Sequence, residues 1–332
     1  MENGFWSKLK TPILAVAPMY DITDTAFRQV IAACGKPSVF FTEFVSVDGL
    51  TNPKSKAKLT KYLLQFNEIE RPIVAQIWGI DPKKFYEAAK IITELGFDGI
   101  DINMGCPDKA VIKMGAGSAL ILNPKLAQEI ISETKRGACS ADGKTVLPVS
   151  VKTRLGYTTN IISEWLPYLL EAKPAAITIH GRTMKQMSKV PADWNAIAEA
   201  KQIVKDSETL ILGNGDIRSL EDAHEKIKIC GIDGVMIGRG VLGNPWFFNK
   251  EKNESNITQK ERFEVLQMHI NLFEKYFKNF KNFHMLKKHI KSHISGFDGA
   301  KEIRAELMNA KTLDELKSQL ENLTPLETFN KK

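Results

Sequence analysis

The sequence predicts an α/β fold, a (β/α)8 TIM barrel followed by a small all-helical C-terminal domain. Eight short apolar segments alternate with helical patterns between Ile13 and Val241, and repeated β-then-α units give parallel strands with helical crossovers. The segments are continuously apolar rather than alternating, as expected for strands covered on both faces. Eight such units in roughly 240 residues fit the size of a closed barrel.

Each predicted strand is followed by a helical pattern, for example Pro82–Leu95 or Pro124–Arg136. In chain order, the predicted strands are Ile13–Val16, Val39–Thr42, Ile73–Trp78, Gly99–Asn103, Val149–Thr153, Ala176–His180, Leu210–Gly213 and Gly234–Ile237.

The pattern changes after Pro245, where Lys250–Ile257 is polar and predicts a linker. Thr258 and Glu261 then form a capping box, and apolar residues recur behind it at helical spacing. These residues are Phe263, Leu266, Ile270, Phe273 and Phe277. They are expected to form a core rather than a ligand site.

Further helices are expected over 283–294, 300–310 and 312–320, the last opened by a second capping box of Thr312 and Glu315. We therefore divide the chain into a catalytic barrel (1–245), a linker (246–257) and a helical domain (258–332).

The composition excludes several classes of protein. The 332 residues are 43% hydrophobic, enough for a large core, and the net charge of +7 leans toward polyanionic partners. The four cysteines show no CxxC spacing, so we expect neither a disulfide framework nor a metal site. We find no signal peptide and no membrane span, and predict a cytoplasmic protein with reduced thiols and no obligate protein partner.

The most unusual polar residues follow the predicted strands, where a barrel of this type carries its catalytic groups. In strand order, these residues are Pro18 and Met19, Glu43, Gln76, Asn103 and Cys106, Lys152 and Arg154, His180 and Arg182, Asn214–Asp216, and Gly238–Gly240. We therefore expect them to meet at one rim.

Two of these loops predict a phosphate site. Gly213–Gly215 and Gly238–Gly240 are glycine-rich turns after strands seven and eight, where barrels often bind phosphate. The alternative is that the glycines only end the strands.

Lys152 is a cation flanked by apolar residues, so it must be paired or neutral. At the rim it is expected to stabilise negative charge on a bound ligand, and the alternative is a structural salt bridge, for instance to Glu43. His180 is expected to hydrogen-bond a ligand at the rim rather than to be a satisfied core histidine.

The segment Asn103–Pro107, which reads NMGCP, places a thiol on a Gly/Pro turn at a strand end. With the segments around it, this motif resembles the signature of the FMN-dependent tRNA-dihydrouridine synthases. Ordered matches run from about residue 13 to about residue 300, and the ordered set is highly specific.

The resemblance implies roles for individual residues. It makes Cys106 the catalytic residue. It assigns flavin contacts to Ala17, Pro18, Met19, Gln76, Lys152 and His180, and the flavin phosphate to Asn214, Gly215, Asp216, Gly238 and Arg239. Substrate contacts fall to Asn103 and Arg182, which are candidates for hydrogen bonds to the base, and to Lys287 and Lys288 of an RNA-binding helical domain.

The implied reaction is reduction of a tRNA uridine by FMN that NADPH has reduced. An ordinary cysteine is mostly thiol near neutrality, so Cys106 is expected to act as an acid that protonates C5. The uridine must be extruded from folded tRNA to reach the rim.

The segment from Trp246 to the end carries about +4 of the +7 charge. Within it, His284, Lys287, Lys288 and Lys291 are expected to share one helical face, which either contacts RNA or is simply solvated. Another basic cluster, at Lys54, Lys56, Lys58 and Lys61, is expected to be a solvated loop.

One loop departs from the family pattern. Met184, Ser188 and Val190 replace the usual residues, whereas Gln186 and Ala192–Trp194 match. Two other readings stay open: another FMN barrel that acts on a free pyrimidine, and a non-catalytic RNA-binding protein on a barrel scaffold.

Overall fold

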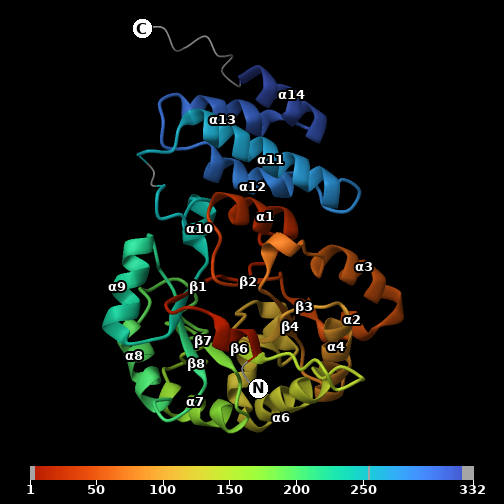
Figure 1. Cartoon of the computed structure of the whole chain (residues 1–332), viewed down its shortest axis with the longest axis vertical. Helices are drawn as coiled ribbons and strands as arrows, with labels where there is room; N and C mark the ends of the chain where they lie inside the picture. The colour runs from red at the N-terminus through yellow and green to blue at the C-terminus, as the bar shows by residue number, and fades with distance from the viewer. Residues whose placement is uncertain (1–3, 253–254, 324–332) are drawn as a thin grey trace.

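The computed structural model describes residues 4–252 and 255–323, and it has the expected barrel (Figure 1). The strands are β1 (Ile13–Val16), β2 (Phe40–Phe41), β3 (Val45–Ser46), β4 (Ile73–Trp78), β5 (Gly99–Met104), β6 (Val149–Arg154), β7 (Ala176–His180), β8 (Leu210–Asn214) and β9 (Gly234–Ile237). All of them pair in parallel: eight follow the order β1-β9-β8-β7-β6-β5-β4-β2, and the short β3 pairs with β4.

Helices surround the barrel and continue beyond it. The barrel helices are α1 (Thr25–Cys34), α2 (Val47–Thr51), α3 (Pro53–Leu63), α4 (Pro82–Glu94), α5 (Lys109–Lys113), α6 (Pro124–Gly137), α7 (Ile162–Glu171), α8 (Trp194–Ile203), α9 (Leu220–Cys230) and α10 (Arg239–Gly243). Three short 3-10 helices are η1 (Gly4–Lys8), η2 (Glu68–Glu70) and η3 (Gly117–Leu122). The C-terminal helices are α11 (Gln259–Phe277), α12 (His284–His293), α13 (Ala300–Asn309) and α14 (Leu313–Leu323).

Among the strands, the second one differs most from the prediction. The expected strand Val39–Thr42 is shortened to β2 and is split from β3, which lies beyond the expected range, because the Thr42 hydroxyl accepts the backbone N–H of Gln76 at 3.1 Å and interrupts the ladder. The barrel closes through a bridge between Ala15 and Val39. The split turns Glu43 and Phe44 out of the ladder at the rim.

The helices α11–α14 form a cluster with its own apolar core, which lies against α1 and α10 (Figure 1). The Thr258–Glu261 capping box is present. At Thr312 only half of the second box forms, because the Glu315 carboxylate accepts from the N–H of Lys311 rather than that of Thr312. The division into barrel, linker and helical domain stays a prediction.

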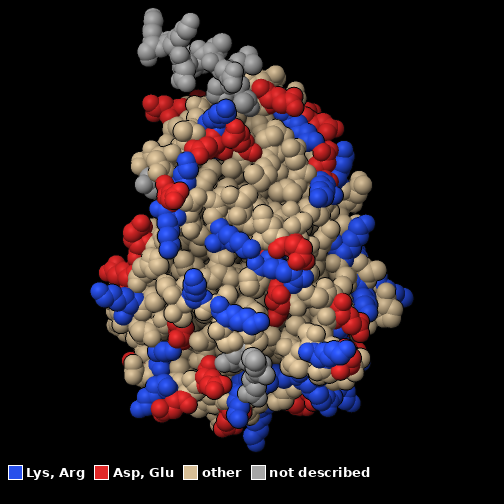
Figure 2. Space-filling model, viewed as in Figure 1, with Lys and Arg blue, Asp and Glu red and all other residues tan. Residues whose placement is uncertain are grey.

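Charged side chains of both signs are interspersed over the face of the molecule seen in Figure 2, without a continuous basic field. The Lys54–Lys61 cluster is not the expected loop: it lies on α3, whose four lysines are all exposed. Along the part of the chain that is described, no helix is long and apolar enough to cross a bilayer.

Three buried histidines lie where the helical cluster meets the barrel. His269 and His289 pack on the ring of Phe27 from α1, with ring centroids 5.9 and 4.7 Å away, and His269 is hydrogen-bonded to His293 at 2.9 Å. Burial lowers the pKa of all three, to about 4 for His289 and about 3 for His293. They are therefore neutral at neutral pH.

These histidines predict sensitivity to acid. Below pH 6.5 the unfolded chain takes up protons that the folded protein excludes, so the free energy of unfolding falls as the pH decreases toward about 4. The slope is at most about 1.4 kcal/mol per pH unit for each histidine. Urea denaturation at pH 7, 6 and 5 measures it. His289→Phe should flatten the slope while His284→Ala, at an exposed position, should not, and equal stability at pH 7 and 5 would contradict the expectation.

Candidate active site at the carboxyl end of the barrel

A pocket with a cavity volume of about 330 Å³ opens at the carboxyl ends of the strands. All the rim residues that were expected to bind the flavin or the base, and the expected catalytic residue Cys106, line this pocket. They are Ala17, Pro18, Met19, Gln76, Asn103, Cys106, Lys152, His180, Arg182, Asn214, Gly215, Asp216, Gly238 and Arg239. The fold thus brings together side chains from strands far apart in the sequence.

The thiol of Cys106 sits on a turn that is fixed on both sides. The side-chain oxygen of Asn103 accepts the backbone N–H groups of Gly105 and Cys106, at 3.1 and 2.9 Å. Ser118 donates its hydroxyl and its N–H to the carbonyl of Cys106, at 2.9 and 3.1 Å. Burial raises the pKa of the Cys106 thiol above its ordinary value, so the protonated form prevails at neutral pH.

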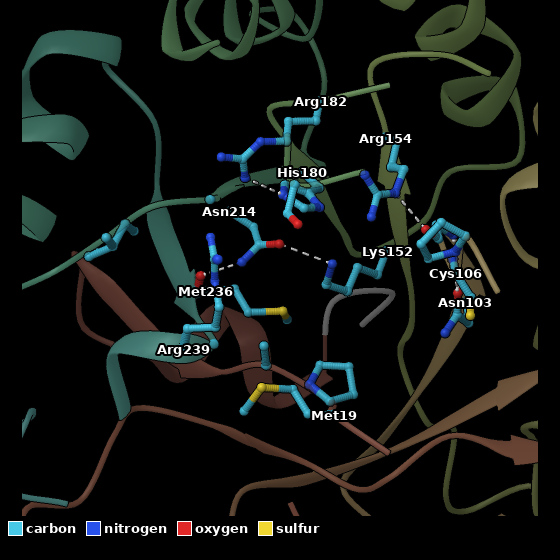
Figure 3. A pocket seen from close by; sticks show the side chains of 18 of the residues that line it. Met19, Asn103, Cys106, Lys152, Arg154, His180, Arg182, Asn214, Met236 and Arg239 are labelled. Atoms are coloured by element: carbon cyan, nitrogen blue, oxygen red, sulfur yellow. Dashed lines mark hydrogen bonds between the residues drawn. The ribbon is translucent and has the colours of Figure 1, made fainter. Parts of the chain in front are cut away.

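Lys152 reaches from β6 across the pocket to β8 (Figure 3), where its ammonium donates to the amide oxygen of Asn214 at 3.1 Å. Enclosure by the barrel and the neighbouring Arg154 guanidinium lower its pKa to about 8. The alternative of a salt bridge from Lys152 to Glu43 is wrong, because Glu43 pairs with Lys281 instead.

His180 is neutral, because burial and the surrounding cations, Lys152 first among them, lower its pKa to about 2. A guanidinium nitrogen of Arg182 lies 3.1 Å from His180 Nε2 (Figure 3). Since arginine can only donate, Nε2 accepts and the ring proton is on Nδ1.

Arg182 is buried and already engaged by protein groups. Its Nε donates to the carbonyl of Val190 at 2.6 Å, and another nitrogen forms an ion pair with Asp216. Arg239, largely exposed, binds the other oxygen of Asp216 at 2.9 Å. Both arginines lower the pKa of Asp216, mainly through the hydrogen bond from Arg182.

The pocket suits an elongated anionic ligand. Cys106 and Arg239 lie on opposite sides of it, with Lys152 and Asn214 between them (Figure 3). Lys152, Arg154, Arg182 and Arg239 line it together with a single carboxylate, that of Asp216. Anions bind where cations and backbone N–H groups converge.

Only one of the two glycine-rich turns leads directly into a helix. Gly238 precedes the short helix α10 and makes no side-chain cap there. After Gly215, by contrast, the chain runs on to Ser219 before α9 begins. Gly215 has φ +132°, and a Cβ there would lie 2.7 Å from Ala192, so this position requires glycine.

Sequence reasoning missed several residues of the site. The sequence indicates only that Arg154 ends a strand, yet its Nε donates to the Gly105 carbonyl at 2.7 Å and its Nη1 to the carbonyls of Thr183 and Met187. Phe44 lines the pocket and carries no sequence signal, and Ser188, singled out above only as a departure from the family pattern, lines it too. Asp101 could have been found from the sequence, because a carboxylate within an apolar strand indicates a buried polar contact.

The two lysines of α12 with predicted substrate contacts lie outside the pocket. The Lys287 ammonium donates to the carbonyls of Met308 and Ala310, at 2.7 and 2.5 Å, and so ties α12 to the end of α13. Lys288 is exposed, as are His284 and Lys291 on the same helix. Three of the four side chains expected to form the basic face of this helix are therefore exposed to solvent, and Lys287 is half-buried.

Comparison with known proteins identifies the family. The sequence profile described as dihydrouridine synthase (Dus) matches residues 15–330. The chain belongs to the dihydrouridine synthase family. It is 42% identical over 325 residues to a probable tRNA-dihydrouridine synthase of Staphylococcus aureus (strain COL), covering 97% of this chain and 96% of that protein. It is 40% identical over 326 residues to the probable tRNA-dihydrouridine synthase 2 of Bacillus subtilis (strain 168), with 97% of each chain covered.

Membership of the dihydrouridine synthase family confirms the expected enzyme class, a flavin-dependent oxidoreductase. Among solved structures, the chain resembles histamine dehydrogenase from Rhizobium sp. 4-9 (TM-score 0.53, 13% identity) and a 2-naphthoyl-CoA reductase (TM-score 0.56, 11% identity). The matches cover 78% and 72% of this chain and about half of those chains, 48% and 49%. At this identity they bear on the fold alone.

A buried ionic contact joins the helical cluster to the rim of the pocket. Lys281, which follows α11, donates to Asp24 and to Glu43, each at 3.0 Å. Glu43 also accepts the N–H of Asp21 at 2.6 Å, in the loop that follows β1. Burial raises the pKa of Glu43 to about 7, and Lys281 opposes that shift.

Removal of this cation is expected to destabilise the protein. Lys281→Met leaves two buried carboxylates without their partner, which costs about 3 kcal/mol. The control is Lys278→Met, three residues earlier, whose exposed pair with Glu274 is worth about 0.5 kcal/mol. Urea denaturation at pH 7 compares the two variants, and equal losses would contradict the assignment.

Proposed function

We propose that the protein is a tRNA-dihydrouridine synthase that reduces the C5=C6 bond of specific uridines in tRNA. The observation that carries the proposal is a fixed, protonated thiol at one end of a pocket whose other end is cationic. The relatives named above, which the chain covers almost completely, support the same reaction.

The cofactor in this proposal is FMN, reduced by NADPH. Arg239, Asn214 and the turns at Gly215 and Gly238 would hold its phosphate end, with Lys152, His180, Gln76 and Met19 around its ring. The residues fit this group, because the cations outnumber the single carboxylate of the pocket. When bound, the flavin supplies a hydride to C6 of the uracil.

Lys152 would stabilise negative charge on the ring. Its pKa of about 8 leaves it mostly protonated at pH 7. The amide of Asn214 fixes its ammonium by accepting at 3.1 Å and by donating in turn to the carbonyl of Met236 at 2.7 Å. The neutral His180 offers Nδ1–H as a hydrogen-bond donor.

Cys106 is the proton donor in this mechanism. Addition of hydride to C6 leaves enolate character at C5, and the thiol transfers its proton there to complete 5,6-dihydrouridine. The thiolate left behind is reprotonated from solvent, which its raised pKa favours. General-acid catalysis of this kind contributes about 10²- to 10⁴-fold to the rate.

The substrate in this proposal is a uridine extruded from tRNA. Asn103 and Arg182 line the pocket where the base would enter, although both already bond to protein groups. The helical domain would grip the body of the RNA through exposed cations such as Lys288 and Lys291. Lys287 would contribute charge while its ammonium supports α13.

The Cys106→Ala variant tests the chemistry. It should bind flavin and accept electrons from NADPH as the wild type does, and lose about 10²- to 10⁴-fold in dihydrouridine formation. Stopped-flow absorbance follows the flavin, and mass spectrometry of tRNA follows the product. The matched control, Cys139→Ala, removes an exposed thiol and should change neither. Undiminished product from Cys106→Ala across pH would refute the role.

The helical surface is tested through the salt dependence of tRNA binding. Lys288→Ala with Lys291→Ala should weaken binding and reduce the slope of log K against log salt by about 2, since each lost phosphate contact removes about 1. Lys83→Ala with Lys90→Ala, two exposed lysines of α4 on the outside of the barrel, is the control. Equal slopes for the two pairs, measured by filter binding, would exclude this surface.

A further inference from the structure

We propose that Asp101, which touches neither the thiol nor the pocket, is the positioning residue that orients the amides of Gln76 and Asn103 and through them the Cys106 turn. The proposal rests on the proposed function, because the oriented groups are those expected to face flavin and base. It is carried by one continuous chain of hydrogen bonds across β4, β5 and β6.

The chain begins at the turn. The backbone N–H groups of Gly105 and Cys106 can only donate, so the side-chain atom of Asn103 that faces them must be its oxygen. The Asn103 NH₂ group then faces away from the turn and donates to the side-chain oxygen of Gln76 at 3.0 Å.

The next link runs from Gln76 to Asp101. With its oxygen committed to Asn103, its NH₂ group points at Asp101 and donates to a carboxylate oxygen at 2.7 Å. The other oxygen of Asp101 accepts the hydroxyl of Ser150 at 2.7 Å. Along these links, every donor points toward the carboxylate.

A carboxylate suits the end of this chain, because an ionised carboxylate can only accept. Asp101 is fully buried, and burial raises its pKa to about 6, so it is mostly ionised at pH 7. The positive charge of Lys152, on the adjacent strand β6, favours the ionised form of Asp101. Flipping either amide would place N–H groups against N–H groups, and buried donors without acceptors are costly.

Replacement by valine and by asparagine separates the role of Asp101 as a hydrogen-bond acceptor from the role of its negative charge. Valine offers no acceptor, so the buried NH₂ group of Gln76 loses its partner and only the hydrogen bond from Asn103 still holds the Gln76 amide. Asparagine can still accept from Gln76 with its oxygen while it donates to the Ser150 hydroxyl, which accepts as well as donates. Asp101→Val should therefore disorder the turn, and Asp101→Asn should largely preserve it.

A matched control lies three residues earlier in the chain. Asp98 is a carboxylate at the entry to β5, where it accepts the N–H of Ile73 at 2.8 Å and a guanidinium N–H of Arg71 at 3.0 Å. Asp98→Val thus removes a carboxylate that, like Asp101, accepts one hydrogen bond on each oxygen, but it lies at the opposite end of the same strand. It should leave the Cys106 turn as it is.

The test is site-resolved alkylation of the full-length protein by iodoacetamide, read by peptide mass spectrometry at equal flavin occupancy. A Cys139→Ser background removes the exposed thiol, while Cys34 and Cys230 are buried and report unfolding. In Asp101→Val, Cys106 should react at least threefold faster, because a loosened turn exposes its thiol, with Cys34 and Cys230 still protected. Asp101→Asn and Asp98→Val should match the background protein.

Turnover gives a second readout. In Asp101→Val, kcat for tRNA reduction should fall at least tenfold with KM for tRNA unchanged, whereas a loss of RNA binding would raise KM. Unchanged Cys106 alkylation in Asp101→Val, or a joint rise at Cys106, Cys34 and Cys230, overturns the positioning role. Absence of dihydrouridine formation in the wild type would refute the proposed function alone, since the alkylation result does not depend on it.

Discussion

The site depends on keeping several cations inside the mouth of a barrel without a carboxylate for each. Lys152, Arg154 and Arg182 stay there because carbonyl and amide oxygens accept from them. Neutral acceptors satisfy hydrogen bonds but do not cancel charge. The pocket therefore keeps a positive potential, which Asp216 in its lining and the buried Asp101 beside Lys152 offset only in part. Together with burial, which is the larger cause, this surplus depresses the pKa of His180. It is also the feature that an anionic cofactor would neutralise.

Much of this site could be predicted from sequence because parallel strands bring their carboxyl ends to one edge. An apolar run followed by an unusual polar residue, such as Gln76 or His180, is enough to place that residue at the rim. The partners could not be predicted in the same way. That Glu43 meets Lys281 depends on how helices 238 positions away dock on the barrel, and that Thr42 interrupts a strand depends on which backbone group its hydroxyl meets.

The helical cluster does not rest on the barrel through apolar contact alone. Ala26 joins the apolar core of the cluster, and Phe27 packs against two neutral histidines. Lys281 adds a directional contact, because its ammonium must lie between two carboxylates at once. Such contacts resist sliding more than apolar faces do. The orientation of the helices over the rim is thereby set by the same side chains that hold the loop after β1.

The segment between Met184 and Val190 is held in an unusual way. Arg154 and Arg182 bind it through the carbonyl oxygens of Met187 and Val190, which every amino acid possesses. These contacts of the two arginines do not depend on which side chains the segment carries, whereas Gln186 holds it through its side chain, which accepts the N–H of Thr183 at 2.8 Å. Substitutions such as Met184, Ser188 and Val190 can accumulate there while the barrel retains its shape. This segment is a place where related enzymes can diverge in substrate preference without rebuilding the machinery beneath.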